Sequence, residues 1–271
     1  QEDSVDIFLI NTTWGQTGWI YEDSEERRWI DSILQKTITY KQNNKTPFDV
    51  SLQITIPNEW ERIANYNIGY TAGIETTKIA PVWIEKSKLM DKIIVVSEHA
   101  KYGFDNSVYE ATHKDTGEVF DDYRCTTPID VVSYPIRSFD PVDIDISLDY
   151  DFNFLVMAQW SPRKNVENTI RWLVDEFEND EVGLVLKLNY KNNCVMDRHG
   201  TEQAVKQVLG DKQRKCKVYL IHGDMSDGEL TSLYSHEKIK AFISLAHGEG
   251  FGLPIFEAAY NELPVISPAW G

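Results

Sequence analysis

Residues 246–259 read AHGEGFGLPIFEAA, and we expect them to form a glycine-rich loop that leads directly into a helix. The apolar residues 241–245 before them are typical of a short buried strand. Three alternating glycines allow the backbone to turn sharply and to approach a ligand, because glycine has no Cβ. Pro254 suits the first turn of a helix, where its missing N–H would have no partner anyway. The pattern therefore predicts a strand, an anion-binding loop and the positive end of a helix dipole in succession.

Two glutamates bracket this loop, Glu249 within it and Glu257 in the first turns of the helix. A carboxylate aimed at an anion would repel it, so we expect both to accept hydrogen bonds from hydroxyl groups beside the anion. A molecule with phosphates and many hydroxyls is a nucleotide sugar. The alternative is an ordinary strand-to-helix turn in which Glu257 interacts with the helix dipole. That alternative explains Glu257 but not the glutamate set among alternating glycines.

Composition indicates a globular chain with room for two domains: 271 residues, 42% hydrophobic and 12% aromatic. Its formal net charge of −16 is divided into −12 for residues 1–150 and −4 for residues 151–271. An acidic surface argues against nucleic acid and anionic lipid as partners and favours a neutral acceptor. No apolar run approaches the ~20 residues of a membrane-spanning helix.

Three cysteines without a C-x-x-C pair indicate a reducing cytoplasm and structural roles. The first residues contain no basic segment of a signal peptide, so we expect a cytoplasmic location. Cys194 and His199 lie close in sequence, but two potential ligands do not make a zinc site, and we expect no metal.

The first half alternates apolar runs with stretches of helical spacing, which predicts parallel strands joined by helices. We expect strands at 7–10, 49–56, 67–71, 92–96 and 130–134, and helices at 25–35, 81–90 and 97–103. Residues 107–127 break this rhythm and predict a hairpin insert around Lys114-Asp115-Thr116-Gly117. We place a domain boundary at about 136–150, in an acidic stretch without helical period. Asp143-Ile144-Asp145 is read as part of that linker, since no glycine loop lies beside it.

The second half repeats the alternation more regularly, and it predicts strands at 154–158, 182–188, 217–221, 241–245 and 264–267. Helices are expected at 165–177, 202–209, 226–234 and 254–261, the third of which begins with the capping box Ser226-Asp227-Gly228-Glu229. We therefore expect an α/β protein with two doubly wound, Rossmann-like domains, residues 1–140 and 151–271, joined by a linker at 141–150. Ligands of such sheets bind beyond the carboxyl ends of the strands, here in a cleft between the domains.

With these residues in view, the chain resembles the GT-B glycosyltransferases of the large retaining group that carries an E-x7-E motif (glycosyltransferase family 4-like, "glycosyl transferases group 1"). The motif corresponds to Glu249 through Glu257 within HGEGFGLPIFEAAYNELPVISPAWG. A second match, MAQWSPRKNVENTI at 157–170, resembles the first strand and phosphate loop of the family's donor domain. Lys164 falls on the family's lysine, whereas Gln159 stands where arginine is usual. Arg163, directly before Lys164, could supply the missing positive charge.

The resemblance implies a role for each matching residue. Glu257 is similar to the glutamate that binds the ribose hydroxyls of the nucleotide, and Glu249 to the one beside the transferred sugar. Lys164 would stabilise the charge that develops on the departing diphosphate, together with Arg163 and the backbone N–H groups of residues 250–253. The donor-binding residues expected are therefore Arg163, Lys164, Lys187, His247, Gly250, Phe251, Gly252, Leu253 and Glu257, and the expected catalytic residues are Glu249 and Lys164.

The expected activity is metal-independent transfer of a sugar, with retention, from a nucleotide-diphosphate sugar to a hydroxyl of a saccharide or glycoconjugate. Glu75 and Thr76 are candidates on the acceptor side. We expect no cofactor besides the nucleotide-sugar co-substrate, no nucleic acid and no transmembrane segment. Two alternatives stay open: a GT-B epimerase or phosphorylase, and a non-catalytic nucleotide-sugar-binding module. The family's opening strand-and-glycine loop is not evident and its closing helices do not follow, so we expect truncation at one or both ends.

Overall fold

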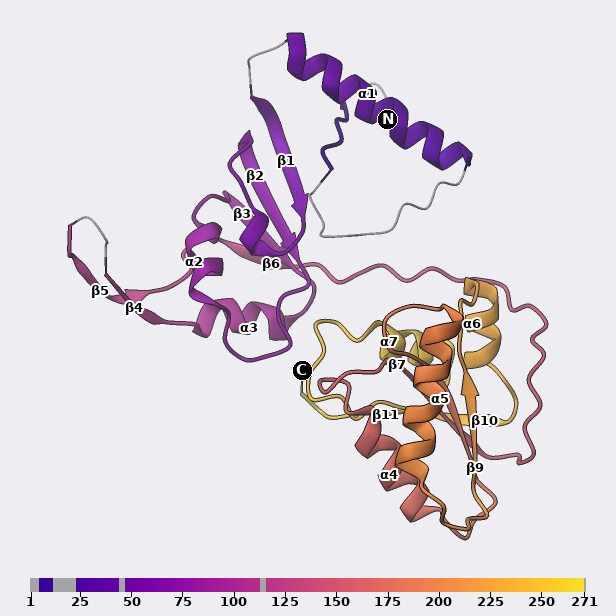
Figure 1. Cartoon of the computed structure of the whole chain (residues 1–271). Helices are drawn as coiled ribbons and strands as arrows, with labels where there is room; N and C mark the ends of the chain where they lie inside the picture. The colour runs from indigo at the N-terminus through magenta and orange to yellow at the C-terminus, as the bar shows by residue number, and fades with distance from the viewer. Residues whose placement is uncertain (1–4, 12–22, 44–46, 113–115, 271) are drawn as a thin grey trace. The chain divides into compact units, whose positions relative to one another are not determined.

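Strands and helices alternate along most of the chain, as the sequence predicts. The structure is a computed structural model that describes residues 5–11, 23–43, 47–112 and 116–270. Its elements form two larger sheets and a separate two-stranded ribbon (Figure 1). By contacts between Cα atoms the chain divides into two compact units, of which the first holds residues 1–71, 81–94 and 125–129, and the second the remainder.

The five-stranded sheet has the order β11-β10-β7-β8-β9, and its strands run parallel in every pair. The strands are β7 (Asn153–Gln159), β8 (Gly183–Asn189), β9 (Lys217–Ile221), β10 (Ile239–Ile243) and β11 (Val265–Ile266). They are connected by α4 (Val166–Glu176), α5 (Val195–Leu209), α6 (Asp227–Tyr234) and α7 (Leu253–Tyr260). The capping box at Ser226 and Glu229 forms as expected and fixes the start of α6.

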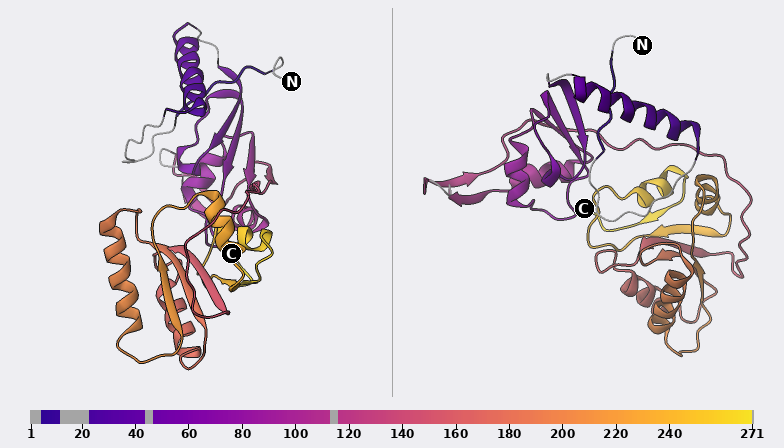
Figure 2. Two further views of the ribbon diagram at one scale, coloured as in Figure 1. Left: turned by 90° about the vertical axis from the view of Figure 1, so that its right-hand side faces the viewer. Right: turned by 45° about the horizontal axis from the view of Figure 1, so that its top comes forward.

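Alternation along β7 and β8 supplies a core to each face of this sheet. Phe154, Val156, Leu184 and Leu186 pack with α4 and α5, whereas Leu155 and Val185 pack with α6 and α7 on the opposite face. The helices accordingly lie on both sides of the sheet in the views of Figures 1 and 2. Burial on both faces explains why these strands are continuously apolar in sequence.

The other large sheet has the order β1-β2-β3-β6, built from β1 (Phe48–Ile54), β2 (Ala64–Thr71), β3 (Lys92–Val95) and β6 (Ile129–Val131). Helices α1 (Glu25–Asn43), α2 (Pro81–Ser87) and α3 (Glu98–Asn106) and the 3-10 turn Pro57–Glu59 complete its part of the chain. Asn67 is fully buried, and its side chain accepts hydrogen bonds from the N–H groups of Ile63 and Ala64 and donates one to the carbonyl of Ala64. Parallel sheets combined with helices confirm the expected α/β fold class.

Two predicted features of the first half have different outcomes. The predicted hairpin insert is confirmed as antiparallel β4 (Tyr109–Thr112) and β5 (Val119–Tyr123), although residues 113–115 of its turn lie outside the described residues. The predicted buried strand at residues 7–10 is wrong: these residues form no strand, and Ile7 is 54% exposed. The N–H of Leu9 bonds to the Thr37 hydroxyl of α1 instead of a neighbouring strand. An apolar run becomes a strand only where a partner strand takes up its hydrogen bonds.

Gly183 opens β8 against a side chain that has no room to move. A Cβ at this position would lie 1.7 Å from Oδ1 of Asn153, which is fully buried and donates hydrogen bonds to the carbonyls of Tyr150 and Lys238. We predict that Gly183→Ala lowers the free energy of unfolding by about 1–3 kcal/mol, since overpacking a fixed core displaces Asn153.

Gly200 provides the matched control, because it lies inside α5 and a Cβ there meets nothing within 4 Å. Gly200→Ala is expected to raise the free energy of unfolding by about 0.5–1 kcal/mol. Urea unfolding followed by circular dichroism measures both changes. Equal effects of the two substitutions would contradict the packing of Asn153 against Gly183.

Candidate functional site

The strand order of the five-stranded sheet defines where a ligand is expected. β7 and β10 are neighbours, but the chain leaves β7 for α4 on one face and leaves β10 for α7 on the other. Ligands of open α/β sheets bind at such a switch point, beyond the carboxyl ends of the strands. Loop 160–165 follows β7 and loop 246–252 follows β10, so the two sequence motifs meet at this edge.

One carboxylate holds two cationic side chains at the switch point. Glu249 Oε1 lies 2.5 Å from Nζ of Lys164, and Oε2 lies 3.2 Å from Nη1 of Arg163. The Lys164 and Glu249 side chains are only 15% and 18% exposed, whereas that of Arg163 is 40% exposed. The two predicted catalytic residues are therefore brought together, and Arg163 joins them through a second donation to the carbonyl of Gly248 at 2.9 Å.

The backbone around Lys164 is held in an uncommon conformation. Asn165, the residue before α4, has a φ of +52°, in the left-handed region that asparagine tolerates better than most residues. Its buried side chain donates to the carbonyl of Leu245, and the N–H of His247 donates to the carbonyl of Arg163 at 2.8 Å. Loop 160–165 is thus tied to the end of β10, which places Lys164 beside Glu249.

The loop after β10 turns into α7 as the glycines predict. Gly252 precedes the helix with a φ of +79°, a conformation that favours glycine, and Pro254 lies in the first turn. No side chain caps the first N–H groups of α7, so they point from the positive end of the helix toward the loop. The predicted backbone donors at Gly250, Phe251, Gly252 and Leu253 lie on this turn.

Glu257 projects from α7 to the face of the sheet covered by α6. Its Oε2 accepts a hydrogen bond of 3.0 Å from the hydroxyl of Tyr234, and the Tyr234 side chain is almost fully buried. Burial, and then the nearby carboxylate of Glu257, raise the pKa of Tyr234 far above its ordinary value. The phenol therefore stays protonated and fixes one carboxylate oxygen, which leaves the other free to accept from a ligand hydroxyl.

The remaining predicted donor residues differ in their surroundings. Lys187, near the carboxyl end of β8, donates from Nζ to the carbonyl of Gly223, and burial lowers its pKa while Asp224 opposes this effect. His247 is exposed and contributes to the loop through its backbone. Gln159, in place of the family's arginine, is also exposed, and its amide donates to the carbonyl of Tyr190 at 2.8 Å.

The two residues expected on the acceptor side are Glu75 and Thr76, both in the second unit. Glu75 Oε1 lies 3.6 Å from Nη2 of Arg163. Thr76 is exposed, and its hydroxyl donates to the carbonyl of Lys78, a local contact within its own turn.

Sequence reasoning missed a buried pair, Asp197 and His222, at the carboxyl edge of β8 and β9. Asp197 Oδ2 lies 2.9 Å from Nε2 of His222, and the side chains are 7% and 3% exposed. Burial alone would raise the pKa of Asp197, but hydrogen bonds from His222 and from the N–H groups of Tyr190, Lys191 and Asn192 outweigh it and lower the pKa to about 2. The spacing predicts a helix from residue 202, whereas the helix begins at Val195, so Asp197 falls outside the predicted helix. An acidic residue just after a helix start was the available signal.

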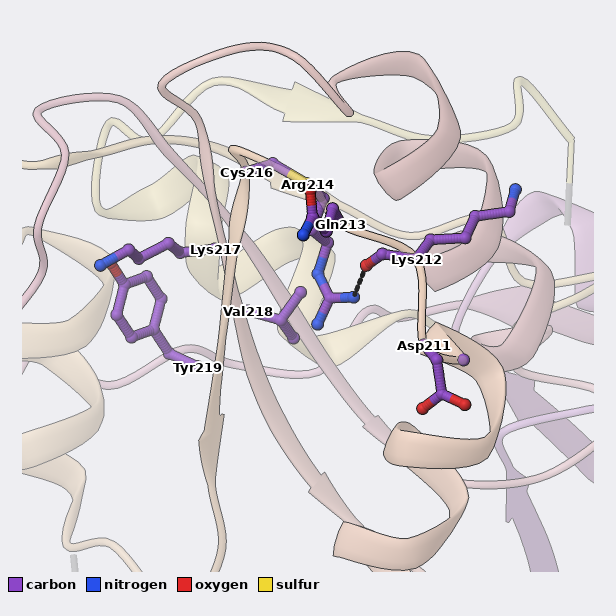
Figure 3. A pocket seen from close by; sticks show the side chains of 9 residues that line it. Asp211, Lys212, Gln213, Arg214, Cys216, Lys217, Val218 and Tyr219 are labelled. Carbon is purple, nitrogen blue, oxygen red and sulfur yellow. Dashed lines mark hydrogen bonds between the residues drawn. The ribbon is translucent and has the colours of Figure 1, made fainter.

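A separate hollow lies at the opposite end of β9 (Figure 3). It is lined by Gly210, Asp211, Lys212, Gln213, Arg214, Cys216, Lys217, Val218 and Tyr219. Figure 3 shows Lys217 and Tyr219 on one side of the strand and Arg214 beside Val218 on the other. This hollow lies at the amino end of β9, whereas the residues around Lys164 follow the carboxyl ends of strands.

The described residues contain neither a cluster of metal ligands nor a helix that could span a membrane. Within residues 5–11, 23–43, 47–112 and 116–270, no three or more His, Cys, Asp and Glu side chains are grouped so that they would hold a metal ion. The helices of the same residues include none with the length and apolar character needed to cross a membrane.

Comparison with known proteins supports the fold through structure alone. No protein-family model matches the chain, and no curated protein matches its sequence. Trehalose-6-phosphate synthase from E. coli, bound with UDP-2-fluoro glucose, aligns with a TM-score of 0.56 at 11% identity, over 89% of this chain and 62% of that one. The lipopolysaccharide outer core galactosyltransferase WaaB in its apo form aligns with a TM-score of 0.52 at 15% identity, over 91% of this chain and 63% of that one.

A UDP-forming trehalose-phosphate synthase from Burkholderia xenovorans aligns with a TM-score of 0.53 at 11% identity, over 89% of this chain and 62% of that one. The chain thus spans less than two thirds of the length of each of these three structures. The fold is that of the GT-B glycosyltransferases, with parallel Rossmann-like sheets, as the sequence predicts.

The lowered pKa of Asp197 predicts a pH dependence of stability. Its pKa is about 2 in the folded chain and close to 3.8 when unfolded, so the carboxylate stabilises the fold above pH 4. This contribution is lost as the pH falls from about 4 to about 2, because the unfolded chain takes up the proton first. We expect the difference in unfolding free energy between the wild type and Asp197→Asn to narrow over that range, as measured by urea unfolding at pH 5, 4, 3 and 2.5. A constant difference would contradict the prediction.

Proposed function

We propose that this chain binds a nucleotide-diphosphate sugar at the β7–β10 switch point and acts as a glycosyltransferase on a hydroxyl of a saccharide or glycoconjugate. The observation that carries the proposal is the meeting of Lys164, Arg163 and Glu249 beside the uncapped N-terminus of α7. Fixed cations and backbone N–H groups favour a diphosphate, and carboxylates accept from sugar hydroxyls. The E. coli structure is bound with UDP-2-fluoro glucose, and the Burkholderia synthase is UDP-forming. Both neighbours support the same assignment.

Departure of the nucleoside diphosphate is the step that these residues would promote. Cleavage of the bond between the anomeric carbon and the phosphate oxygen leaves its electron pair on that oxygen, and negative charge grows there. Lys164 and the N–H groups of residues 250–253 would stabilise this charge, and they need no metal ion to do so. The acceptor oxygen forms the new bond to the anomeric carbon, and its proton passes to the departing diphosphate oxygen. We propose retention at that carbon, with attack from the side of the leaving group.

Glu249 has two roles in this proposal. Without a ligand it pairs with both Lys164 and Arg163, which would otherwise repel each other, and Glu75 lies beside Arg163 as a second carboxylate. With a donor bound, the phosphates take over the two cations, and the carboxylate becomes available to the hydroxyls of the sugar. Glu257, already fixed by Tyr234, would accept from the ribose. We also propose a cytoplasmic location, where nucleotide sugars would be at hand.

The test is a panel of UDP-, GDP-, ADP- and TDP-sugars, scored by thermal shift and by release of the nucleoside diphosphate with and without EDTA. Release of the nucleoside diphosphate in the presence of EDTA would support transfer without a metal ion. A product with the same anomeric configuration as the donor, determined by NMR, would support retention. Phosphate-dependent products or an epimerised donor would indicate a different reaction class. Tight nucleotide binding without turnover would indicate a binding module.

Lys164→Ala is predicted to weaken binding of the matching nucleoside diphosphate about 10- to 100-fold. A hydrogen bond to a charged group contributes about 1.5–3 kcal/mol, and about 1.4 kcal/mol corresponds to a factor of ten. Isothermal titration calorimetry measures the change. The control is Arg171→Ala, which removes an exposed cation from the same helix, α4, where it pairs with Glu167. A loss of equal size in the control would show that overall charge, and not the position of Lys164, governs binding.

Glu249→Gln should separate nucleotide affinity from sugar transfer. Loss of the carboxylate removes the charged partner of Lys164 and leaves Arg163 with Glu75 alone, so the nucleoside diphosphate is expected to bind severalfold more tightly. Transfer or hydrolysis of the sugar donor is expected to fall by about 10²-fold, since a positioned polar partner of the sugar is lost. Titration with the diphosphate and steady-state assays with the sugar donor test the two directions. Full activity of this variant would refute the catalytic assignment.

A further inference from the structure

Tyr190, directly after β8, is held at three points. Its N–H donates to Asp197 Oδ2 at 2.9 Å, and its carbonyl accepts from the Gln159 amide at 2.8 Å. Its ring stacks on that of Trp160, with the ring centroids 5.3 Å apart and the planes 18° from parallel. Together these contacts offset the conformational entropy that is lost when a loop residue is fixed in one position.

The anchor of this arrangement lies in the interior. Asp197 also accepts from the N–H of Lys191 at 2.9 Å, and its bond to His222 connects it to the loop after β9. Since the Asp197 carboxylate can only accept, Nε2 of His222 carries the proton. We call the five residues Gln159, Trp160, Tyr190, Asp197 and His222 the Tyr190 brace.

Through Trp160, the Tyr190 brace contacts the loop that carries Lys164. Trp160 is partly buried against the core under α4 and α5, and its N–H donates to the carbonyl of Asn189 at 2.7 Å. Four residues later the same loop presents Lys164 to Glu249. A shift of Tyr190 would therefore move Trp160, and with it the start of the loop. Misplacement of a site residue by about 1 Å is enough to lower activity by about 10²-fold.

We propose that Asp197, although it touches no ligand, is a positioning residue that fixes Lys164 for the diphosphate through Tyr190 and Trp160. The proposal rests on the proposed function, since it concerns the same anion site. It also explains Gln159, because where the family pattern places a cation, this chain has an amide that holds the carbonyl of Tyr190.

Asp197→Asn tests the proposal with little change of shape. A carboxamide has one acceptor oxygen, so it cannot accept from Tyr190, Lys191 and His222 together. We expect the Kd for UDP, or for whichever nucleoside diphosphate the panel selects, to rise about tenfold. The matched control is Glu202→Gln, on the same helix, whose carboxylate pairs with Arg198 at the surface and should leave the Kd unchanged. An unchanged Kd in Asp197→Asn would overturn the proposal.

A double-mutant cycle distinguishes positioning from a general structural role. In the Lys164→Ala background, Asp197→Asn is expected to change the Kd by less than about twofold, because its effect passes through Lys164. Equal losses in both backgrounds would overturn the proposal even if the single variant weakens binding.

If Asp197→Asn does not fold, variants of His222 test the hydrogen bond between Asp197 and His222 instead. His222→Gln keeps a donor near the position of Nε2 and is expected to bind UDP as the wild type does. His222→Leu removes the donor and is expected to weaken binding. Equal affinities of these two variants would contradict a role for the bond.

Amide hydrogen exchange separates failure of this inference from failure of the proposed function. If wild-type protein binds no nucleoside diphosphate, the proposed function is wrong. Faster exchange of residues 160–165 in Asp197→Asn, and not in Glu202→Gln, would still show that the brace fixes the loop. Unchanged exchange of residues 160–165 in Asp197→Asn would contradict the claim that Asp197 fixes this loop, whether or not the protein binds a nucleotide.

Discussion

The contact between Glu249 and Lys164 is the interaction on which the arrangement of the candidate site depends. It joins two loops that leave neighbouring strands for opposite faces of the sheet, and it is only 15–18% exposed. Glu249 pairs with Lys164 and Arg163, and Glu75 lies 3.6 Å from Arg163, so two carboxylates match the two cations before the helix dipole of α7 is added. No buried charge is therefore left unpaired when the site is empty, which would be costly, and an anion can replace the carboxylates as the partner of the two cations.

The fold explains why this contact forms between residues 85 positions apart. Parallel strands bring their carboxyl ends to one edge, and β7 and β10 are adjacent although two strands and three helices separate them in sequence. Alternation along β7 then sends side chains to both cores, so that α4 and α7 start from the same edge on opposite faces. Hydrogen bonds from Asn165 to Leu245 and from His247 to Arg163 then hold the two loops together.

The sequence predicted this part of the molecule well because the signals are local. Apolar runs, alternating glycines, Pro254 and the capping box at Ser226 each act within a few residues, and each is found where expected. Pairing is not local. The run at residues 7–10 has the composition of a strand but no strand beside it, and Leu9 bonds to a helix instead.

The same distinction explains what the sequence did not reveal about the site. Resemblance placed Lys164 and Glu249 as separate functional residues, but not as an ion pair. Asp197 and His222 were missed because an error of seven residues in the start of α5 hid the acidic residue in its first turn. Gln159 reads in the sequence as a missing cation, and only the structure shows which carbonyl its amide binds.

Net charge gives these short contacts their importance. A chain with a formal charge of −16 repels an anion at long range, yet this repulsion is screened beyond about 8 Å at physiological ionic strength. Binding of a diphosphate must therefore be decided by groups within hydrogen-bonding distance, where partial burial limits screening. Small displacements of Lys164 then matter more than the surface charge. A chain with this composition has reason to fix the loop from several sides, through Asn165 and Leu245 on one side and through Trp160 and Tyr190 on the other.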